Sequence, residues 1–142
     1  MIDLDIPDVN VVFALLNPSH AHHRTARQWF TRTTRFATTP LTESGFLRLS
    51  LNPSITGRVI STTEALDSLR SMKEDHRVCF LPDDSTLSDP RIDLISLVGH
   101  KQVSNLHLTN LAKTHNARLV TLDARLRQTL VPDDQEFVHP LI

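Results

Sequence analysis

Four polar residues in this chain each stand at the head of an apolar stripe with helical spacing. The apolar or semi-polar partners follow at i+3, i+4 and i+7, which places each leading residue toward the inward side of its predicted helix. A carboxylate in that position is shielded from water, so it must cap the helix, pair with a positive group or bind a metal ion. The four residues are Asp8, Glu43, Asn105 and Asp123.

Helix capping is the simplest explanation for one acidic residue at a helix start, but here the pattern recurs. Asp8 and Asp123 each follow a predicted strand, so in a parallel sheet both reach the same edge. Glu43 and Asn105 lie in the first turns of helices that can point there. Two carboxylates about 4 Å apart repel by roughly 4 kcal/mol at an effective dielectric near 20, and a cation relieves this repulsion. All-oxygen ligands select Mg²⁺ or Mn²⁺, which activates water for phosphodiester hydrolysis.

Short apolar runs predict the buried strands that must position these residues. The strands are expected at Asp3–Ile6, Arg35–Thr38, Val78–Leu81, Arg118–Thr121 and Glu136–Val138. Helical patterns lie between them, at about Asp8–Leu16, His20–Arg32, from near Pro40, from Ser61, Ser104–His115 and Asp123–Leu130. The alternation predicts an α/β fold with a short, mostly parallel central sheet and helices on both faces. A length of 142 residues predicts one domain, residues 1–142.

Two of the helices carry further sequence signals. The segment Ser61-Thr62-Thr63-Glu64 predicts a capping box. Within the helix that follows, Ala65, Leu66, Leu69 and Met72 are expected to face inward. In the helix of residues 20–32, the spacing of Ala26, Trp29 and Phe30 predicts a buried stripe;.

Composition excludes several classes of protein. No apolar run approaches the 18 or so residues needed to cross a bilayer, and the acidic start of the chain is unlike a secretory signal. Cys79 is the only cysteine, which excludes a disulfide framework and a cysteine-based zinc site. A reducing, cytoplasmic location is therefore expected, with no membrane association.

The positive charges are dominated by arginine, which provides 12 of the 15 basic residues. Arginine is well suited to binding phosphate through two parallel hydrogen bonds. A group of these residues is either a phosphate-binding surface or simply a solvated helix face. Its members are Arg24, Arg27, Arg32 and Arg35.

Other kinds of chemistry are weakly supported. His20, His22 and His23 are close in sequence, but adjacent residues at a helix start point in different directions and no cysteine completes a zinc site. Ser19 lacks the G-x-S-x-G context of a nucleophile. Neither a G-x-G-x-x-G motif nor a P-loop is present, which argues against a nucleotide cofactor. A structural protein in which all four polar residues merely cap helices remains an alternative.

Four short segments, taken in order, resemble the PIN-domain ribonucleases, and in particular the VapC toxins of VapBC toxin–antitoxin modules. The resemblance covers nearly the whole chain, including the stretch from Ala14 to His23. The matching segments are Asp8-Val9-Asn10, Thr42-Glu43 with Gly45-Phe46-Leu47-Arg48, Gln102-Val103-Ser104-Asn105 through Leu111-Ala112, and Val120-Thr121-Leu122-Asp123.

This resemblance implies a toxin nuclease and assigns roles to individual residues. Asp8, Glu43 and Asp123 match the catalytic acids that bind Mg²⁺ or Mn²⁺, and Asn10 and Ser104 match residues that support them. The implied substrate is a structured RNA, tRNA or rRNA. The implied partners are a second copy of the chain, in a homodimer, and a VapB-type antitoxin that inserts a segment into the acidic cleft.

Asn105 departs from the family pattern, which has Asp at this position. An amide oxygen still binds a metal ion but contributes no charge. Two hypotheses follow: an active nuclease with a natural amide ligand, or a catalytically silent PIN module that binds RNA or protein without cutting. The amide is compatible with a natural residue and with a substitution that disarms a toxic nuclease.

Overall fold

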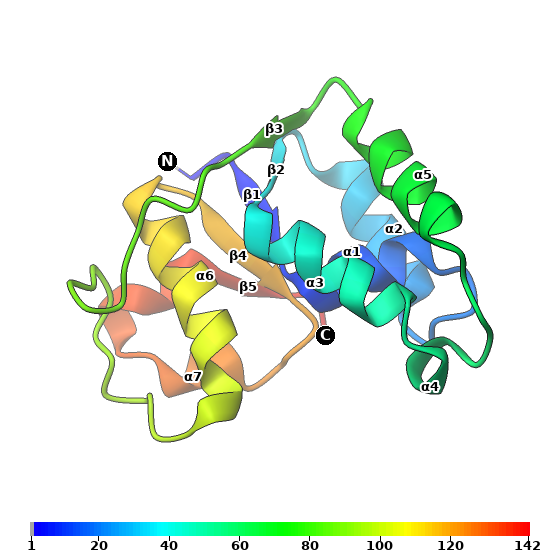
Figure 1. Ribbon diagram of the computed structural model, residues 1–142. Helices are drawn as coiled ribbons and strands as arrows, with labels where there is room; N and C mark the ends of the chain where they lie inside the picture. Colours follow the sequence, from blue (N-terminus) through cyan, green and yellow to red (C-terminus); the bar gives the residue numbers. More distant parts are fainter. Residues whose placement is uncertain (1) are drawn as a thin grey trace.

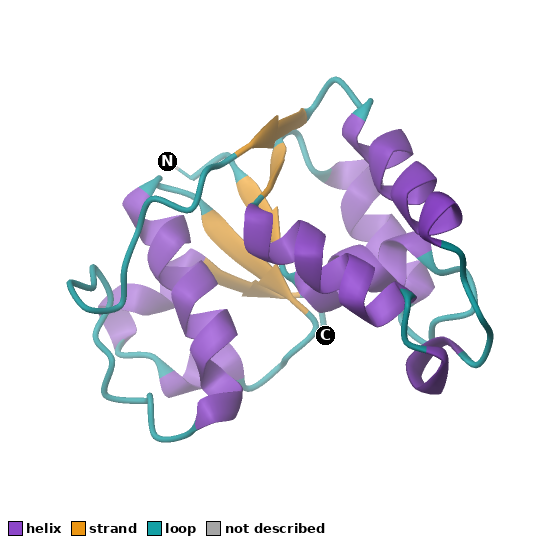
Figure 2. Ribbon diagram, in the orientation of Figure 1, coloured by secondary structure: helices purple, strands orange, loops and turns teal. Residues whose placement is uncertain are grey.

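The computed structural model describes residues 2–142, which form a five-stranded parallel sheet between two groups of helices. Figure 1 shows the order of the elements, and Figure 2 shows the strands enclosed by helices. The strand order is β3-β2-β1-β4-β5, and every neighbouring pair is parallel. The predicted α/β fold with helices on both faces is confirmed, and the sheet is entirely rather than mostly parallel.

The strands are three or four residues long, and the first four overlap the predicted apolar runs, whereas the fifth begins only at the last residue of its predicted run. Their bounds are β1 Asp5–Pro7, β2 Phe36–Thr38, β3 Val78–Phe80, β4 Arg118–Thr121 and β5 Val138–Pro140. Because β1, β2 and β4 are adjacent and parallel, their last residues Pro7, Thr38 and Thr121 lie at one edge of the sheet. This edge is where sites form in parallel α/β folds.

Helices connect the strands and cover both faces. The bounds are α1 Val9–Leu16, α2 His23–Arg32, α3 Pro40–Ser50, α4 Pro53–Thr56, α5 Thr62–Lys73, α6 Val103–Thr114 and α7 Leu126–Thr129, with short 3-10 helices η1 His100–Gln102 and η2 Pro132–Phe137. One apolar cluster joins Phe36 and Val120 of the sheet to residues of α1, α2, α3 and α5. The other joins Ile6, Ala37 and Leu119 to residues of α6 and α7. Successive residues of a strand thus contribute side chains to opposite cores, as the two-residue period of a strand requires.

Several predicted boundaries are wrong near the C-terminus. The predicted helix Asp123–Leu130 begins only at Leu126. The predicted strand Glu136–Val138 falls mostly in η2, and β5 starts at Val138. The cause of the latter is tertiary: the buried Asp134 carboxylate accepts from Lys113 Nζ at 2.7 Å and from the backbone N–H of Asp93 at 2.8 Å. These bonds hold the chain in a turn just before β5.

The start of α5 shows half of the predicted capping box. The Ser61 side chain accepts from the backbone N–H of Glu64, but the Glu64 carboxylate binds Arg58 at 2.8 Å. Ala65, Leu69 and Met72 are buried as predicted, whereas Leu66 is half-buried. In α2, the buried residues are Ala26 and Trp29, and Phe30 is half-buried.

The close packing of α1 against α3 depends on Gly45. A Cβ added at Gly45 would lie 2.6 Å and 2.9 Å from the two Cγ atoms of Val9 and 3.3 Å from its Cβ. The two methyl groups are the main obstacle, and the Val9 Cβ makes a tight contact that requires only a small shift. Val9 follows Asp8 and Gly45 lies two residues after Glu43, so this contact fixes the relative placement of two predicted site residues.

We expect Gly45→Ala to destabilise the protein by about 1–2 kcal/mol, the overpacking cost outweighing the better helix propensity of alanine. Urea unfolding of the parent and the variant checks this expectation. The double variant Gly45→Ala with Val9→Ala restores space and should recover most of the loss. A destabilisation that is unchanged in the double variant would show that the Val9 contact is not its cause.

Candidate functional site

Asp8 is the most deeply buried of the predicted site residues, with 2% of its surface exposed. It follows β1 directly, and its backbone N–H donates to Val120 of β4 at 2.9 Å. Its carboxylate caps α1 by accepting from the backbone N–H of Val11 at 2.9 Å. The capping explanation is therefore correct for Asp8, but capping does not account for its surroundings.

Those surroundings raise the pKa of Asp8 to about 6 from an ordinary 3.8. Burial is the main cause, and the negative charge of Asp123 adds to it. Hydrogen bonds from the Thr121 side chain and from the backbone of Val11 and Asn10 act in the opposite direction. Asp8 is thus a desolvated carboxylate that also feels the charge of a second carboxylate, an arrangement that a cation would stabilise.

Asp123 is exposed rather than inward-facing, which corrects the prediction from its helical spacing. It lies in the turn between β4 and α7, where its backbone N–H donates to Thr121 Oγ1 at 3.0 Å and its carboxylate accepts from the backbone of Arg125 at 2.9 Å. The helical phase does not apply, because α7 starts three residues later at Leu126.

Asn105 and Asp123 line one pocket of about 410 Å³. Asn105 is half-buried in the first turn of α6, and the pocket also contains Lys101 and Arg125. An amide oxygen, a carboxylate and two positive side chains therefore meet at the carboxyl end of β4. Such a pocket combines potential metal ligands with groups that bind phosphate.

Glu43 lies in the first turn of α3 and is engaged by two donors. Its Oε2 accepts from Thr38 Oγ1 at 2.6 Å and from Lys73 Nζ at 2.6 Å. Thr38 is the last residue of β2, so Glu43 is held at the same sheet edge as Asp8. The structure brings Asp8, Asp123 and Asn105 into one region and attaches Glu43 to that edge through Thr38, but Glu43 already has a positive partner.

The donor set suits a hard cation, since all four side chains offer oxygen. Within residues 2–142, no three His, Cys, Asp or Glu side chains form a ready-made metal site. This is consistent with Asn105 in place of an acid and with Lys73 bound to Glu43. The supporting residues predicted from the family lie nearby in sequence: Asn10 is exposed in α1, and Ser104 is exposed in α6.

Three polar residues of this region were not predicted as functional from the sequence. Thr38 and Thr121 each end a strand, and their hydroxyls contact Glu43 and the Asp8–Asp123 pair. A threonine at the end of a strand, just before a candidate acid, is a signal that sequence can provide. Lys73 is 30 residues from Glu43, and no local pattern connects the two.

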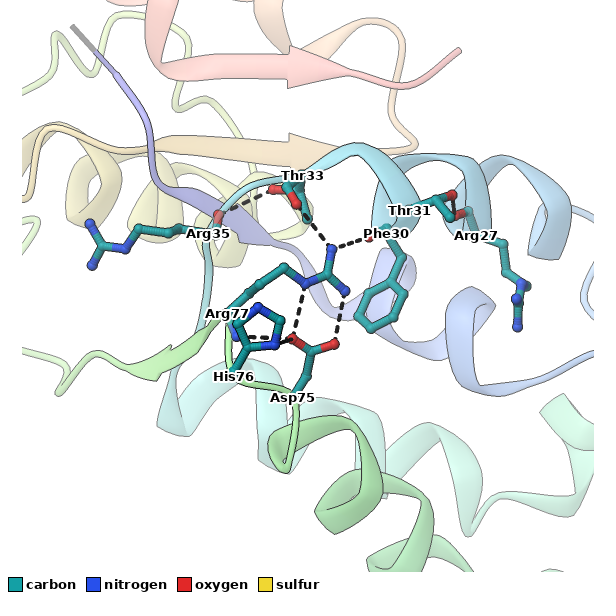
Figure 3. Close-up of polar contacts among 8 residues, drawn as sticks. All are labelled: Arg27, Phe30, Thr31, Thr33, Arg35, Asp75, His76 and Arg77. Carbon is teal, nitrogen blue, oxygen red and sulfur yellow. Dashed lines mark hydrogen bonds and ion pairs between the residues drawn. The ribbon is translucent and has the colours of Figure 1, made fainter.

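The arginine group predicted from sequence lies elsewhere. Arg24, Arg27, Arg32 and Arg35 are all exposed, and in Figure 3 the side chains of Arg27 and Arg35 point away from the surrounding contacts. Arg35 precedes β2 and so lies at the sheet edge opposite to Thr38. These four residues fit a solvated face, whereas Lys101 and Arg125 line the pocket beside Asn105 and Asp123.

We expect Asp8→Asn to stabilise the metal-free protein at neutral pH. Asparagine caps helices as well as aspartate does, but it carries no charge to bury. Because folding raises its pKa, Asp8 stabilises the folded protein in its protonated form. This contribution is complete below about pH 4 and is lost as pH rises through about 6;. The gain should reach up to about 3 kcal/mol at pH 7.5 and vanish near pH 4, as measured by urea unfolding in EDTA. An equal gain in the free energy of unfolding at both pH values would mean that the charge of Asp8 does not cause the gain.

Within the described residues, every helix is too short or too polar to cross a lipid bilayer. A comparison of the chain with models of known protein families finds no match.

Comparison with curated proteins finds several close relatives in Mycobacterium tuberculosis. The chain is 43% identical to ribonuclease VapC38 over 119 residues, which cover 82% of this chain and 83% of the relative. It is 41% identical to ribonuclease VapC39 over 126 residues, covering 84% and 88%, and 34% identical to ribonuclease VapC29 over 120 residues, covering 84% and 85%. With this identity over most of both chains and a parallel α/β fold that presents acids at one sheet edge, the chain belongs to the VapC family of PIN-type toxins.

Proposed function

We propose that this chain is a metal-dependent endoribonuclease, the toxin of a VapBC-type toxin–antitoxin pair, and that it hydrolyses phosphodiester bonds in structured RNA such as tRNA or rRNA. Membership of the VapC family supports the reaction class. The observation that carries the proposal is the buried Asp8 carboxylate, whose pKa is raised to about 6 beside Asp123 at the carboxyl edge of the sheet. A buried carboxylate within electrostatic reach of a second negative charge is costly in a structural role and useful around a cation.

In this proposal the oxygens of the four site residues hold one or two Mg²⁺ or Mn²⁺ ions. The ligands are Asp8, Glu43, Asn105 and Asp123. When bound, the metal supplies a water of lowered pKa and neutralises charge on the phosphodiester. A carboxylate that is not coordinated orients the attacking water, and Asn10 and Ser104 support the acids.

Substrate positioning falls to the cations of the Asn105–Asp123 pocket. Lys101 and Arg125 line this pocket beside both residues, so phosphates flanking the cleaved bond can be held within reach of the acids. Such contacts fix the register of the RNA rather than its sequence. The acidic edge is also the surface on which a VapB-type antitoxin would insert a basic segment.

The second candidate is a silent module that binds RNA or protein without cleavage. Two observations favour it: the amide of Asn105 adds no negative charge, and the Glu43 carboxylate is bound by Lys73. Both reduce the attraction of this edge for a divalent cation.

Asn105→Asp distinguishes the two functions. We expect the variant to bind Mn²⁺ more tightly in calorimetry and to cleave structured RNA at least about 100-fold faster, because an acid both attracts the metal and polarises water. The added substitution Asp8→Ala should abolish this cleavage. If the parent already cuts RNA at the rate of the variant, Asn105 is a competent ligand and the silent module is wrong. If neither cuts tRNA or rRNA with Mn²⁺ present, the nuclease proposal is wrong.

We also propose a homodimer formed through the segment that joins α3 to α5. Three large apolar side chains are exposed there, namely Leu51 at 42%, Ile55 at 51% and Val59 at 82%. Apolar groups exposed together mark protein interfaces. The helices from Pro40 and Ser61, which flank this segment, then belong to the same interface.

Sedimentation of the parent should give a mass near twice 16.1 kDa, and Ile55→Lys with Val59→Lys should shift it toward the monomer. Val98→Lys is the control, since Val98 is 86% exposed on the loop before η1. A parent mass near that of one chain at all concentrations would exclude the dimer, and a dimer unaffected by the Lys substitutions would place its interface elsewhere.

A further inference from the structure

Lys73 contacts the predicted site although neither the sequence pattern nor the family match assigns it a role. Its Nζ lies 2.6 Å from Glu43 Oε2, and the two side chains are 34% and 20% exposed. The same oxygen accepts from Thr38 Oγ1, also at 2.6 Å. One carboxylate oxygen therefore accepts two short hydrogen bonds, which uses the two lone pairs that it offers.

The lysine is presented from a well-anchored position. It is the last residue of α5, and its ammonium lies 5.1 Å from the centre of the Phe80 ring in β3. An ammonium over an aromatic face is attracted by the ring electrons. The lysine is thus fixed from two sides, by a carboxylate on α3 and by a ring on β3.

The turn that follows Lys73 is anchored by Arg77, as Figure 3 shows. The Arg77 guanidinium donates to both oxygens of Asp75 at 2.9 Å and to the carbonyls of Phe30 and Thr33 at 2.6 Å and 3.0 Å. These bonds tie the turn to the C-terminal end of α2. The pKa of Asp75 is held well below its usual range by these contacts with Arg77, so the anchor persists across physiological pH.

We infer that Lys73 is a built-in counter-ion that occupies the place of a cation at Glu43, so that a divalent metal ion must displace it to bind this carboxylate. The inference rests on the proposed metal-dependent function. An ammonium cannot ligate a metal ion, and its charge repels one. Lys73 therefore stabilises the metal-free acidic edge and weakens metal binding there.

The chain offers a matched control in Lys113. Its Nζ lies 2.7 Å from Asp134 Oδ1 and 5.5 Å from the centre of the Phe137 ring. The side chain is 31% exposed and its carboxylate partner 3%. It reproduces the ammonium, carboxylate and aromatic ring of the Lys73 contact, with a carboxylate that the proposed function does not use.

The test is Mn²⁺ titration by calorimetry of the full chain and of Lys73→Met and Lys113→Met. Removing a positive charge next to a metal ligand should tighten Mn²⁺ binding by about tenfold or more. We expect this gain in Lys73→Met and an affinity within about twofold of the parent in Lys113→Met. Methionine keeps the apolar stem of lysine over the ring, so packing is retained.

A double variant shows whether the effect passes through Glu43. Adding Glu43→Gln to Lys73→Met should remove the gain in affinity, because the carboxylate that Lys73 neutralises is then absent. In EDTA, Lys73→Met should unfold at a lower temperature than the parent. Addition of Mn²⁺ should raise the unfolding temperature of Lys73→Met by more than it raises that of the parent. If Lys73→Met unfolds in solution, Lys73→Gln provides the same test with a polar side chain.

The outcomes separate this inference from the proposed function. If the parent binds Mn²⁺ or the Asn105→Asp variant cuts RNA, yet Lys73→Met leaves the affinity unchanged or weaker, the counter-ion role is wrong and the function stands. An equal gain in Mn²⁺ affinity in Lys113→Met would show that the gain comes from the change in net charge, and would also overturn the role of Lys73. If no variant binds Mn²⁺ or cuts RNA, both proposals are wrong.

Discussion

The burial of one carboxylate, that of Asp8, is the constraint around which this structure is organised. Asp8 joins β1 to α1, its backbone is bonded to β4, and its side chain caps the helix. Folding therefore places a negative charge where solvent cannot stabilise it. The hydrogen bond from Thr121 offsets only part of that cost, since the pKa remains raised. A protein that keeps such a group at a sheet edge, beside a second acid, carries a local electrostatic cost that a cation can remove.

The remaining acids sit at the same edge by different physical means. Glu43 is brought there by the capping of α3 at Thr39 and by the hydroxyl of Thr38, and the contact of Gly45 with Val9 sets the distance between its helix and α1. Asp123 is placed by a turn whose hydrogen bonds are local. The site is thus built from one buried, one half-buried and one exposed carboxylate. Of the three, the buried Asp8 has a pKa that its burial raises.

Positive side chains balance this edge in two ways. Lys73 is bound directly to Glu43, whereas Lys101 and Arg125 line the open pocket beside Asn105 and Asp123. The first arrangement neutralises an acid within the fold, and the second leaves charge available to an anionic ligand. At the other edge of the sheet, the buried Asp5 is fully engaged by Trp29, Thr33 and Arg118 at 2.8–2.9 Å. Comparable acids are therefore structural at one end of the strands and suited to chemistry at the other.

The sequence by itself determined the alternation of strands and helices, the cap of α1 at Asp8, the start of α3 at Pro40 and the candidate acids near strand ends. These features depend on local physics: apolar runs, caps and the fixed φ of proline act within a few residues. Sequence could not show that Asp123 is exposed, that Asp134 bends the chain before β5, or that Lys73 binds Glu43. Each of these depends on contacts between distant segments, whose energies are decided by burial and charge in the assembled fold. Only the tertiary structure therefore decided how the acids are solvated and which positive groups accompany them.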